Sequence, residues 1–382
     1  MEDKILIRIA KAQAIILKLL GKTFKEIKDI APSQLHIIKQ QLVYGGRLDE
    51  IIKELSEALN ITIEETQALL EAQAQKDYKF AKVYYEAKNQ EYVPLKENIA
   101  LKTMLDTIKG SAAMDELYIL TTAGLTYLDI DGNKVTKPIK EAFKDIIDKA
   151  VLTIQMGAGT YEREVQKQLK TLAKAGIRRI EYASGNTRRI DSALRMTISD
   201  QLNELANSQQ RILGEQYGAD GIEISVHEYP APDHEDIQGY QFDKTNHEKV
   251  FNNQDAETYQ GKVIYAKERR HIGWYNCKHL EYQIVLGINQ PRYTETELKA
   301  IIKRNKDGFK YNGRKYTMYE GTQLQRRLET QIRQVRDQIS ATEGYGEPDP
   351  ELENQLQACL NEYKKVCSIA NLPINYDRIR SY

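Results

Sequence analysis

The stretch VHEYPAPDHEDIQGYQF, residues 226–242, sets two histidines seven residues apart with two prolines between them. A second stretch, WYNCKH at residues 274–279, adds a cysteine and a third histidine. The whole chain has only six histidines and three cysteines, so their concentration here predicts a functional or structural centre. The residues that would form it are His227, His234, Cys277 and His279.

Three interpretations of this centre stay open. Imidazole and thiolate groups suit zinc and four ligands complete a tetrahedron, although zinc modules usually pair ligands at closer spacing than this one. Alternatively, Cys277 is a nucleophile with a histidine base that Asp233 orients, or the DHED run at 233–236 holds a divalent ion. Such a run is more typical of a solvated turn that starts a helix. The sequence favours the third interpretation, in which the histidines hold an irregular, proline-stiffened loop together.

Length and charge limit the class of protein. The 382 residues are enough for about two or three domains, each with its own core. Lysine plus arginine equals aspartate plus glutamate at 55 each, which argues against coating nucleic acid by bulk charge. Three cysteines without paired spacing predict no disulfide framework and folding in a reducing cytoplasm. Neither a signal peptide nor a membrane span is expected, because charges interrupt every apolar segment.

Residues 1–115 are predicted to be helical throughout and to serve as a docking region. Apolar residues recur at spacings of three and four, the pattern of an amphipathic helix. We expect Gly21 to end this first helix, a second helix within 32–45, and a third that begins at a Thr62–Glu65 capping box. The apolar residues of the first helix are Ile5, Ile9, Ala12, Ile16 and Leu20.

Residues 116–320 are predicted to form a compact mixed domain with short strands. Hairpins are expected at Asp131–Gly132 and at Asn312–Gly313, where the turn needs positive φ angles. Further strands are expected at 177–183, 221–227, 262–265 and 282–286. Helices are expected at 139–155, at 160–174 with Gly176 as C-cap, and from a Thr187 cap to Leu213.

Residues 321–382 are predicted to form a pair of helices. The first has a narrow apolar seam from Leu324 to Ile339, and the sequence GYGEPDP separates it from a second helix at 350–370. Two helices joined in this way indicate an antiparallel hairpin or a partner-binding seam. The chain as a whole is therefore expected to be α+β and predominantly α-helical.

Basic residues provide a separate hypothesis. Residues 301–340 contain ten lysines and arginines against four acidic residues, with tyrosines between them that can stack on bases. A solvated face or an acidic protein partner explains the same pattern and is favoured over direct contact with nucleic acid. The candidate contact residues are Arg188, Arg189, Arg269, Arg270, Arg327 and Arg333.

Four stretches in order, at 182–206, 226–242, 273–298 and 311–338, carry a family resemblance. Together they resemble the minor capsid protein 2 family of tailed phages that infect Gram-positive bacteria, which is related to the phage Mu F-like head-morphogenesis proteins. The positions that match the family's motifs are Arg195, His227, Pro232, His234, Gln238, Gly239, Asn276, Cys277, His279, Tyr316, Tyr319, Glu320, Gln323 and Arg326.

The chain departs from the family pattern at four of its motif positions. Ala231 stands where relatives commonly have arginine, and Ile237 stands where tryptophan is frequent. Gly273 replaces a second cysteine that relatives often carry, and Lys278 replaces arginine. The loss of that cysteine weakens the case for an obligatory metal site with two thiolates.

The resemblance implies a structural protein of the phage virion rather than an enzyme. Family members act in head assembly or DNA delivery, enter the head in few copies, and associate with the portal, scaffold or major capsid protein. The implied location is the portal vertex of the virion, after synthesis in the host cytoplasm. The resemblance implies no small-molecule substrate, and zinc is the one cofactor that the residues allow. The alternatives are a DNA-binding virion protein that uses residues 301–340, or a metal-dependent hydrolase or toxin-like effector.

Overall fold

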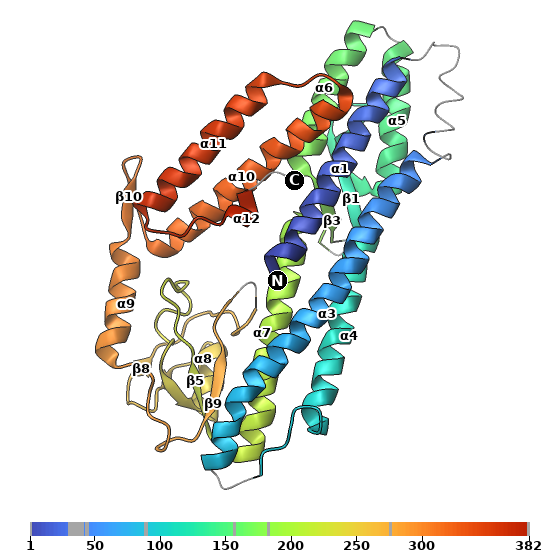
Figure 1. Cartoon of the computed structure of the whole chain (residues 1–382). Coiled ribbons are helices and arrows are strands. Elements are labelled where there is room, and N and C mark those ends of the chain that lie inside the picture. The colour runs from blue at the N-terminus through green and yellow to red at the C-terminus, as the bar shows by residue number, and fades with distance from the viewer. Residues whose placement is uncertain are drawn as a thin grey trace.

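The computed structural model describes residues 2–29, 42, 46–87, 91–155, 158–181, 184–274 and 277–379. Long helices that pack along one another form the spine of the molecule (Figure 1). Most of the helix predicted within 32–45 and the motif residue Asn276 lie outside the described residues. The helices of the spine are α1 (Glu2–Lys28), α3 (Arg47–Ala87), α4 (Ile99–Thr121) and α7 (Ile190–Tyr217).

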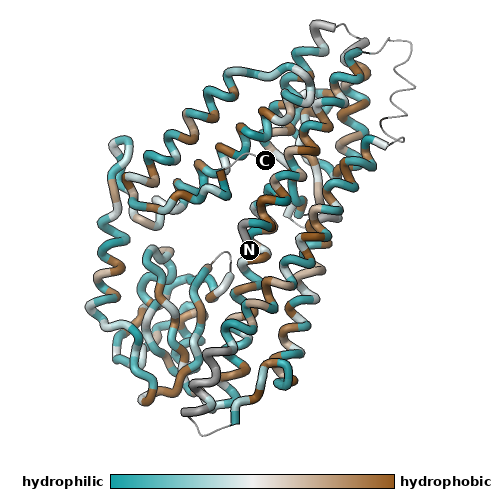
Figure 2. The backbone as a smooth tube through the Cα atoms, viewed as in Figure 1, coloured by the Kyte–Doolittle hydropathy of each residue, from teal (hydrophilic) through white to brown (hydrophobic). Residues whose placement is uncertain are grey.

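The first helix buries the stripe that the sequence predicts, because Ile5, Ile9 and Ile16 are all inaccessible to solvent. Figure 2 shows the corresponding hydrophobic segments recurring along α1 and α3. The prediction that Gly21 ends this helix is wrong, since α1 continues to Lys28. Gly21 instead lets another helix approach the backbone of α1.

The predicted helix start at Thr62 is also wrong. The helix α3 runs from Arg47 to Ala87 without interruption, and the Thr62 hydroxyl donates a hydrogen bond back to the carbonyl of Ala58 at 2.7 Å. Threonine can satisfy its hydroxyl inside a helix in this way, so its presence does not require a helix end. The 41 residues of α3 give a rod about 60 Å long.

A four-stranded antiparallel sheet in the order β2-β1-β3-β4 lies at one end of the spine. The predicted hairpin at Asp131–Gly132 is confirmed, and Gly176 adopts the expected positive φ after its helix. Thr187 does not cap a helix but pairs with Ile180, and Arg189 precedes the first turn of α7. The elements of this region are β1 (Ala123–Leu128), β2 (Lys134–Pro138), α5 (Ile139–Gln155), α6 (Ala158–Ala175), β3 (Ile177–Ile180) and β4 (Thr187–Arg189).

A second region of short strands lies at the opposite end of the spine (Figure 1). Its main sheet has the order β6-β5-β9, and β9 packs against α7. A small core that includes Ile224, Phe242 and Cys277 holds the region together. Its elements are β5 (Gly221–Ile224), β6 (Gln241–Asp243), α8 (Lys244–Phe251), β7 (Ala256–Glu257), β8 (Val263–Ile264), β9 (Glu281–Ile284) and α9 (Glu295–Asp307).

The C-terminal helices form an antiparallel pair that packs within the chain (Figure 1). Leu328, Ile332 and Val335 of the predicted seam are buried against Leu352 and Tyr363 of the second helix. A capping box starts the first helix, and Pro350 begins the second. The elements are β10 (Phe309–Tyr311), β11 (Arg314–Tyr316), α10 (Met318–Tyr345), α11 (Pro350–Ile369) and α12 (Tyr376–Ile379). The fold class, α+β and mostly helical, is thereby confirmed.

Candidate functional site

The histidine-rich loop leaves the main small sheet at the end of β5 and returns to it. Ser225 donates its backbone N–H to the carbonyl of Leu280 at 2.8 Å, and Gly239 donates to Ile224 at 2.8 Å. Gly239 has a φ of +75°, and a Cβ there would lie 2.4 Å from a Leu298 methyl group. Only glycine can close the loop at this position without displacing Leu298.

Acidic side chains at 233–236 anchor this loop to the rest of the region. The expectation that they form a solvated, helix-starting turn is wrong, because each pairs with a basic side chain and the segment is a series of turns. These contacts also occupy Arg269 and Arg270, two of the candidate residues for contact with a partner. The pairs are Asp233–Arg270 at 2.7 Å, Glu235–Lys306 at 3.1 Å and Asp236–Arg269 at 2.6 Å.

Three of the four candidate ligands converge in the interior. The Cys277 Sγ lies 3.4 Å from His234 Nδ1 and 3.4 Å from His279 Nδ1. The side chains of these residues come from two segments about forty positions apart, yet their potential ligand atoms all lie within 4.8 Å of one another. The three residues are buried, with exposures of 0%, 5% and 3% for His234, Cys277 and His279.

Hydrogen bonds orient both imidazole rings of this cluster. His234 Nε2 lies 2.7 Å from the carbonyl oxygen of Arg270, which only accepts, so Nε2 carries the proton. His279 Nε2 lies 3.1 Å from Gln238 Oε1, and the same oxygen accepts the backbone N–H of His227 at 2.8 Å. Each neutral ring therefore presents an unprotonated Nδ1 to the sulfur of Cys277.

His227 lies beside this cluster rather than in it. Its ring meets that of His279 edge-on with 4.5 Å between the ring centroids, and it hydrogen-bonds the backbone of Lys278. Its Nε2 has no hydrogen-bond partner among the residues that the structure describes. Of the four predicted ligands, His234, Cys277 and His279 therefore converge, and His227 lies next to them.

Burial keeps the cluster uncharged at neutral pH. Burial and, to a smaller extent, the neighbouring His227 and His234 lower the pKa of His279 to about 2, and burial lowers the pKa of His234 as well. Burial also raises the pKa of the Cys277 thiol. A raised thiol pKa is the opposite of what a cysteine nucleophile needs, so it gives the nucleophilic interpretation no support.

A cavity of about 430 Å³ opens beside the cluster. His227, His234, Cys277 and His279 line one side, and α10 supplies the other. The sequence motifs that are far apart along the chain therefore meet around one cavity. The residues from α10 are Tyr319, Thr322, Gln323 and Arg326, while Tyr316 lies in β11 and Glu320 completes the capping box of α10.

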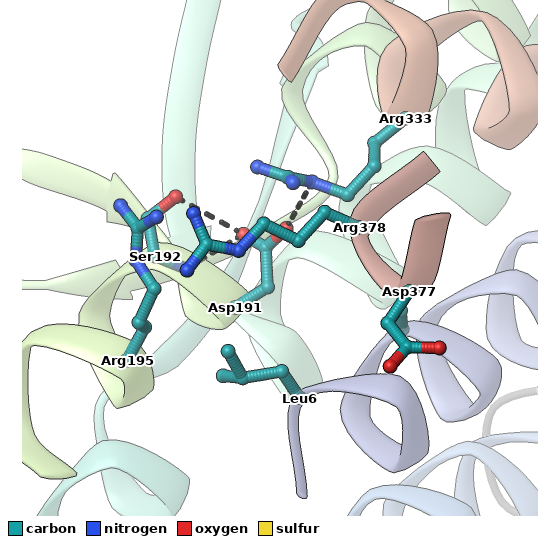
Figure 3. A pocket seen from close by; sticks show the side chains of 8 residues that line it. Leu6, Asp191, Ser192, Arg195, Arg333, Asp377 and Arg378 are labelled. Atoms are coloured by element: carbon teal, nitrogen blue, oxygen red, sulfur yellow. Dashed lines mark hydrogen bonds and ion pairs between the residues drawn. The ribbon is translucent and has the colours of Figure 1, made fainter. Parts of the chain in front are cut away.

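Arg195 of α7 lines a second, much smaller cavity of about 30 Å³. Figure 3 shows its side chain near Arg378 of α12, with Arg333 of α10 bonded to Asp191. The Arg333–Asp191 distance is 2.9 Å. Burial and, to a smaller extent, the nearby Arg378 and Arg326 lower the pKa of Arg195 to about 10. Arg195 therefore belongs to a cluster of arginines that joins three helices.

Most of the basic residues singled out from the sequence are engaged within the chain. Arg189 and Arg269 are buried in ion pairs, so the prediction that they contact a partner is wrong for this conformation. Arg270 and Arg333 also pair with aspartates, whereas Arg188 and Arg327 are exposed. In the basic segment 301–340, further pairs are Arg304–Glu228, Lys306–Glu235 and Arg314–Glu320. At least four of the ten basic residues in this segment are therefore paired within the chain, and contact with DNA stays a prediction.

Two asparagines of α7 that the sequence analysis missed hold the cysteine segment in place. Asn203 donates its side-chain N–H to the Cys277 carbonyl at 2.5 Å, and the Asn207 side chain accepts the Glu281 N–H at 3.0 Å. Asn203 and Asn207 are four residues apart, so they lie on one face of the helix, and this spacing is visible in the sequence. Sequence alone does not tell which segment such a face contacts.

Comparison with known families identifies the class of protein. The chain is a structural protein of a phage capsid. It belongs to the phage minor capsid protein 2 family, whose profile matches residues 10–364. No curated protein and no solved structure gives a significant match. Among the described helices, none is long and apolar enough to cross a membrane.

Proposed function

We propose that this protein is a low-copy component of the phage head that contacts the portal, major capsid or scaffold protein during head assembly. It would be made in the host cytoplasm and carried into the virion at the portal vertex. The observation that supports this proposal is the family match over residues 10–364. The long helical spine agrees with a role that depends on extended surfaces, since α3 alone extends for about 60 Å.

The outer face of α4 is a suitable contact surface. Met114 and Leu117 are 73% and 50% exposed, and Tyr118 is 44% exposed. Their spacing of three and four residues places the three side chains on one face of the helix. An apolar stripe of this kind on the surface is typical of a protein–protein contact. We infer that it packs against an apolar surface of another head protein.

The proposal is tested on assembled particles. Cross-linking followed by mass spectrometry of purified heads is expected to join this chain to the portal, capsid or scaffold protein. Particles made without the gene are expected to show a defect in assembly, DNA content or infectivity, and complementation should restore it. Gene-deleted particles that are normal in all three respects would overturn the proposal.

A pair of variants tests the α4 surface in the same system. Leu117→Lys is expected to fold normally but to enter heads in fewer copies, because a charge would be buried in the contact. Thr107→Lys, at an exposed polar position of the same helix, serves as the matched control and is expected to enter heads normally. Equal incorporation of the two variants would rule out the stripe as the contact.

A further inference from the structure

We propose that His234, Cys277 and His279 bind one Zn²⁺ ion whose fourth coordination position opens into the 430 Å³ cavity. In tetrahedral zinc sites the metal lies about 2.3 Å from sulfur and about 2.0–2.1 Å from nitrogen, which places neighbouring sulfur and nitrogen ligands about 3.5 Å apart. The two distances from the Cys277 Sγ to the histidine Nδ1 atoms are both 3.4 Å. These two pairs therefore already have the separation of neighbouring ligands on one zinc ion, and the two Nδ1 atoms lie within 4.8 Å of each other.

The surroundings of the two histidines have the arrangement that metal-binding imidazoles require. A metal-bound histidine usually donates its other ring N–H to a carbonyl, carboxylate or amide oxygen. His234 does so to the Arg270 carbonyl and His279 does so to Gln238. The backbone N–H of His227 fixes the Gln238 oxygen as an acceptor, so it also fixes the direction of the His279 lone pair.

Without a metal, the cluster has one donor too few. Two unprotonated Nδ1 atoms face the same sulfur, and a thiol has a single proton that can satisfy only one of them. The remaining lone pair then has no donor within the cluster, which is unfavourable in a buried site. A zinc ion satisfies all three groups at once, as Cys277 releases its proton to solvent and coordinates as the thiolate.

Three protein ligands leave one position of the tetrahedron for a water molecule or a small anion. His227, Tyr319, Gln323 and Arg326 line the cavity beside the cluster. A site with this open position differs from the closed four-ligand sites that only stabilise a fold. Because the inference concerns this cluster alone, it stands or falls independently of the proposed role in head assembly.

The experiment uses the full chain stripped of metal with a chelator and titrated with Co²⁺, which reports both coordination geometry and a thiolate ligand. We expect one cobalt ion per chain, a thiolate-to-cobalt charge-transfer band, and its displacement by one equivalent of Zn²⁺. The variant Cys277→Ser should lose this band. Gln238→Ala should keep the band but weaken metal affinity ~10–100-fold, since it removes the hydrogen bond that orients His279.

The matched control is Cys359→Ser, which removes a partly buried thiol of α11 outside the cluster and should leave the titration unchanged. Circular dichroism checks that each variant is folded. If Cys277→Ser does not fold, the wild-type titration still decides, because its charge-transfer band and stoichiometry do not depend on the variant. A wild-type chain that takes up less than one cobalt ion, or shows no thiolate band, overturns the proposal.

Discussion

Glu116 is an acidic side chain that α4 places in the interior, where it is inaccessible to solvent. Burial raises its pKa from 4.5 to about 7. The folded chain therefore holds a proton that the unfolded chain has released between these values, so stability is lost as the pH rises from about 4.5 through 7. Above pH 7 the folded state contains a buried carboxylate that destabilises it.

Replacing Glu116 by its neutral analogue glutamine should remove the loss of folding stability that occurs as the pH rises. We expect Glu116→Gln to raise the free energy of unfolding at pH 8 by on the order of 1–3 kcal/mol, and to have little effect at pH 4. Urea denaturation at both pH values measures the difference. Asp106→Asn changes an exposed acid on the same helix and should show no such trend. A gain for Glu116→Gln that is the same at pH 4 and pH 8 would contradict the burial argument.

At the scale of single residues, the sequence identified the members of the candidate site but not their roles. His227, His234, Cys277 and His279 stand out because histidine and cysteine are rare in this chain. That His227 lies beside the three converging residues, and that Gln238 bridges it to His279, depends on how two distant segments pack. Rarity is visible in a sequence, whereas the partner of a side-chain amide is not.

The crossing of the helices α1 and α10 depends on the absence of a side chain at Gly21. A Cβ there would lie 2.2 Å from the carbonyl oxygen of Ala341 and 2.8 Å from the N of Tyr345, and both contacts are with backbone. Gly344 makes the reciprocal approach, since its Cβ would lie 2.2 Å from the Lys18 carbonyl oxygen. The two helices therefore pack backbone to backbone at this point.

Gly21→Ala is consequently expected to lower the free energy of unfolding by about 1–3 kcal/mol or more, because two helices have to move apart. Gly110→Ala is the matched control, since Gly110 is also helical but has open space around its Cβ. The control should instead stabilise the protein by about 0.5–1 kcal/mol through helix propensity. Thermal and urea denaturation of both variants measure the effects, and a Gly21→Ala protein as stable as the Gly110→Ala protein would refute the close crossing.

At the scale of elements, the hairpin turns and some helix ends were predictable, whereas the boundaries placed at Gly21, Thr62 and Thr187 were not. The hairpins at Asp131–Gly132 and Asn312–Gly313 are present because their turns need positive φ angles that a local sequence supplies. Gly21 does not end its helix, because it allows a neighbouring helix to pack closely. Thr62 does not start a helix, because its hydroxyl forms a hydrogen bond inside one. Whether a glycine ends a helix or admits a neighbour depends on elements that are far away in the sequence.

The largest hydrophobic core draws on all three regions that the sequence suggested as domains, 1–115, 116–320 and 321–382. It contains Ile5 of α1, Phe143 of α5 and Tyr345 of α10. The first and last long helices thus share one interior with the sheet between them. Amphipathic periodicity predicts that each helix buries one face, but it does not identify the partner of that face.

A buried polar network joins these distant parts of the chain. Asp337 of α10 accepts hydrogen bonds from Gln13 of α1 at 2.7 Å and from Arg189 of β4 at 2.8 Å. Gln13 in turn accepts the backbone N–H of Ile177 at 3.0 Å, and Arg189 also pairs with Asp191 at 3.3 Å. The network therefore fixes how the N-terminal helix, the sheet and the C-terminal helices lie relative to one another.

Removing the central carboxylate should destabilise the whole molecule. Asp337→Ala leaves the positive charge of the buried Arg189 only partly compensated, and it leaves Gln13 without its hydrogen-bond acceptor. We therefore expect the free energy of unfolding to fall by about 3–5 kcal/mol. The matched control is Lys18→Ala, which breaks the half-exposed Lys18–Glu343 pair between the same two helices. That change should cost less than about 1 kcal/mol.

A double variant separates loss of the network from loss of volume. Arg189→Met combined with Asp337→Leu removes both charges and fills the space with apolar atoms, so it should recover much of the stability that Asp337→Ala loses. Urea denaturation of the three variants beside the wild type measures the differences. Equal effects of Asp337→Ala and Lys18→Ala would show that the buried network does not hold the two ends of the chain together.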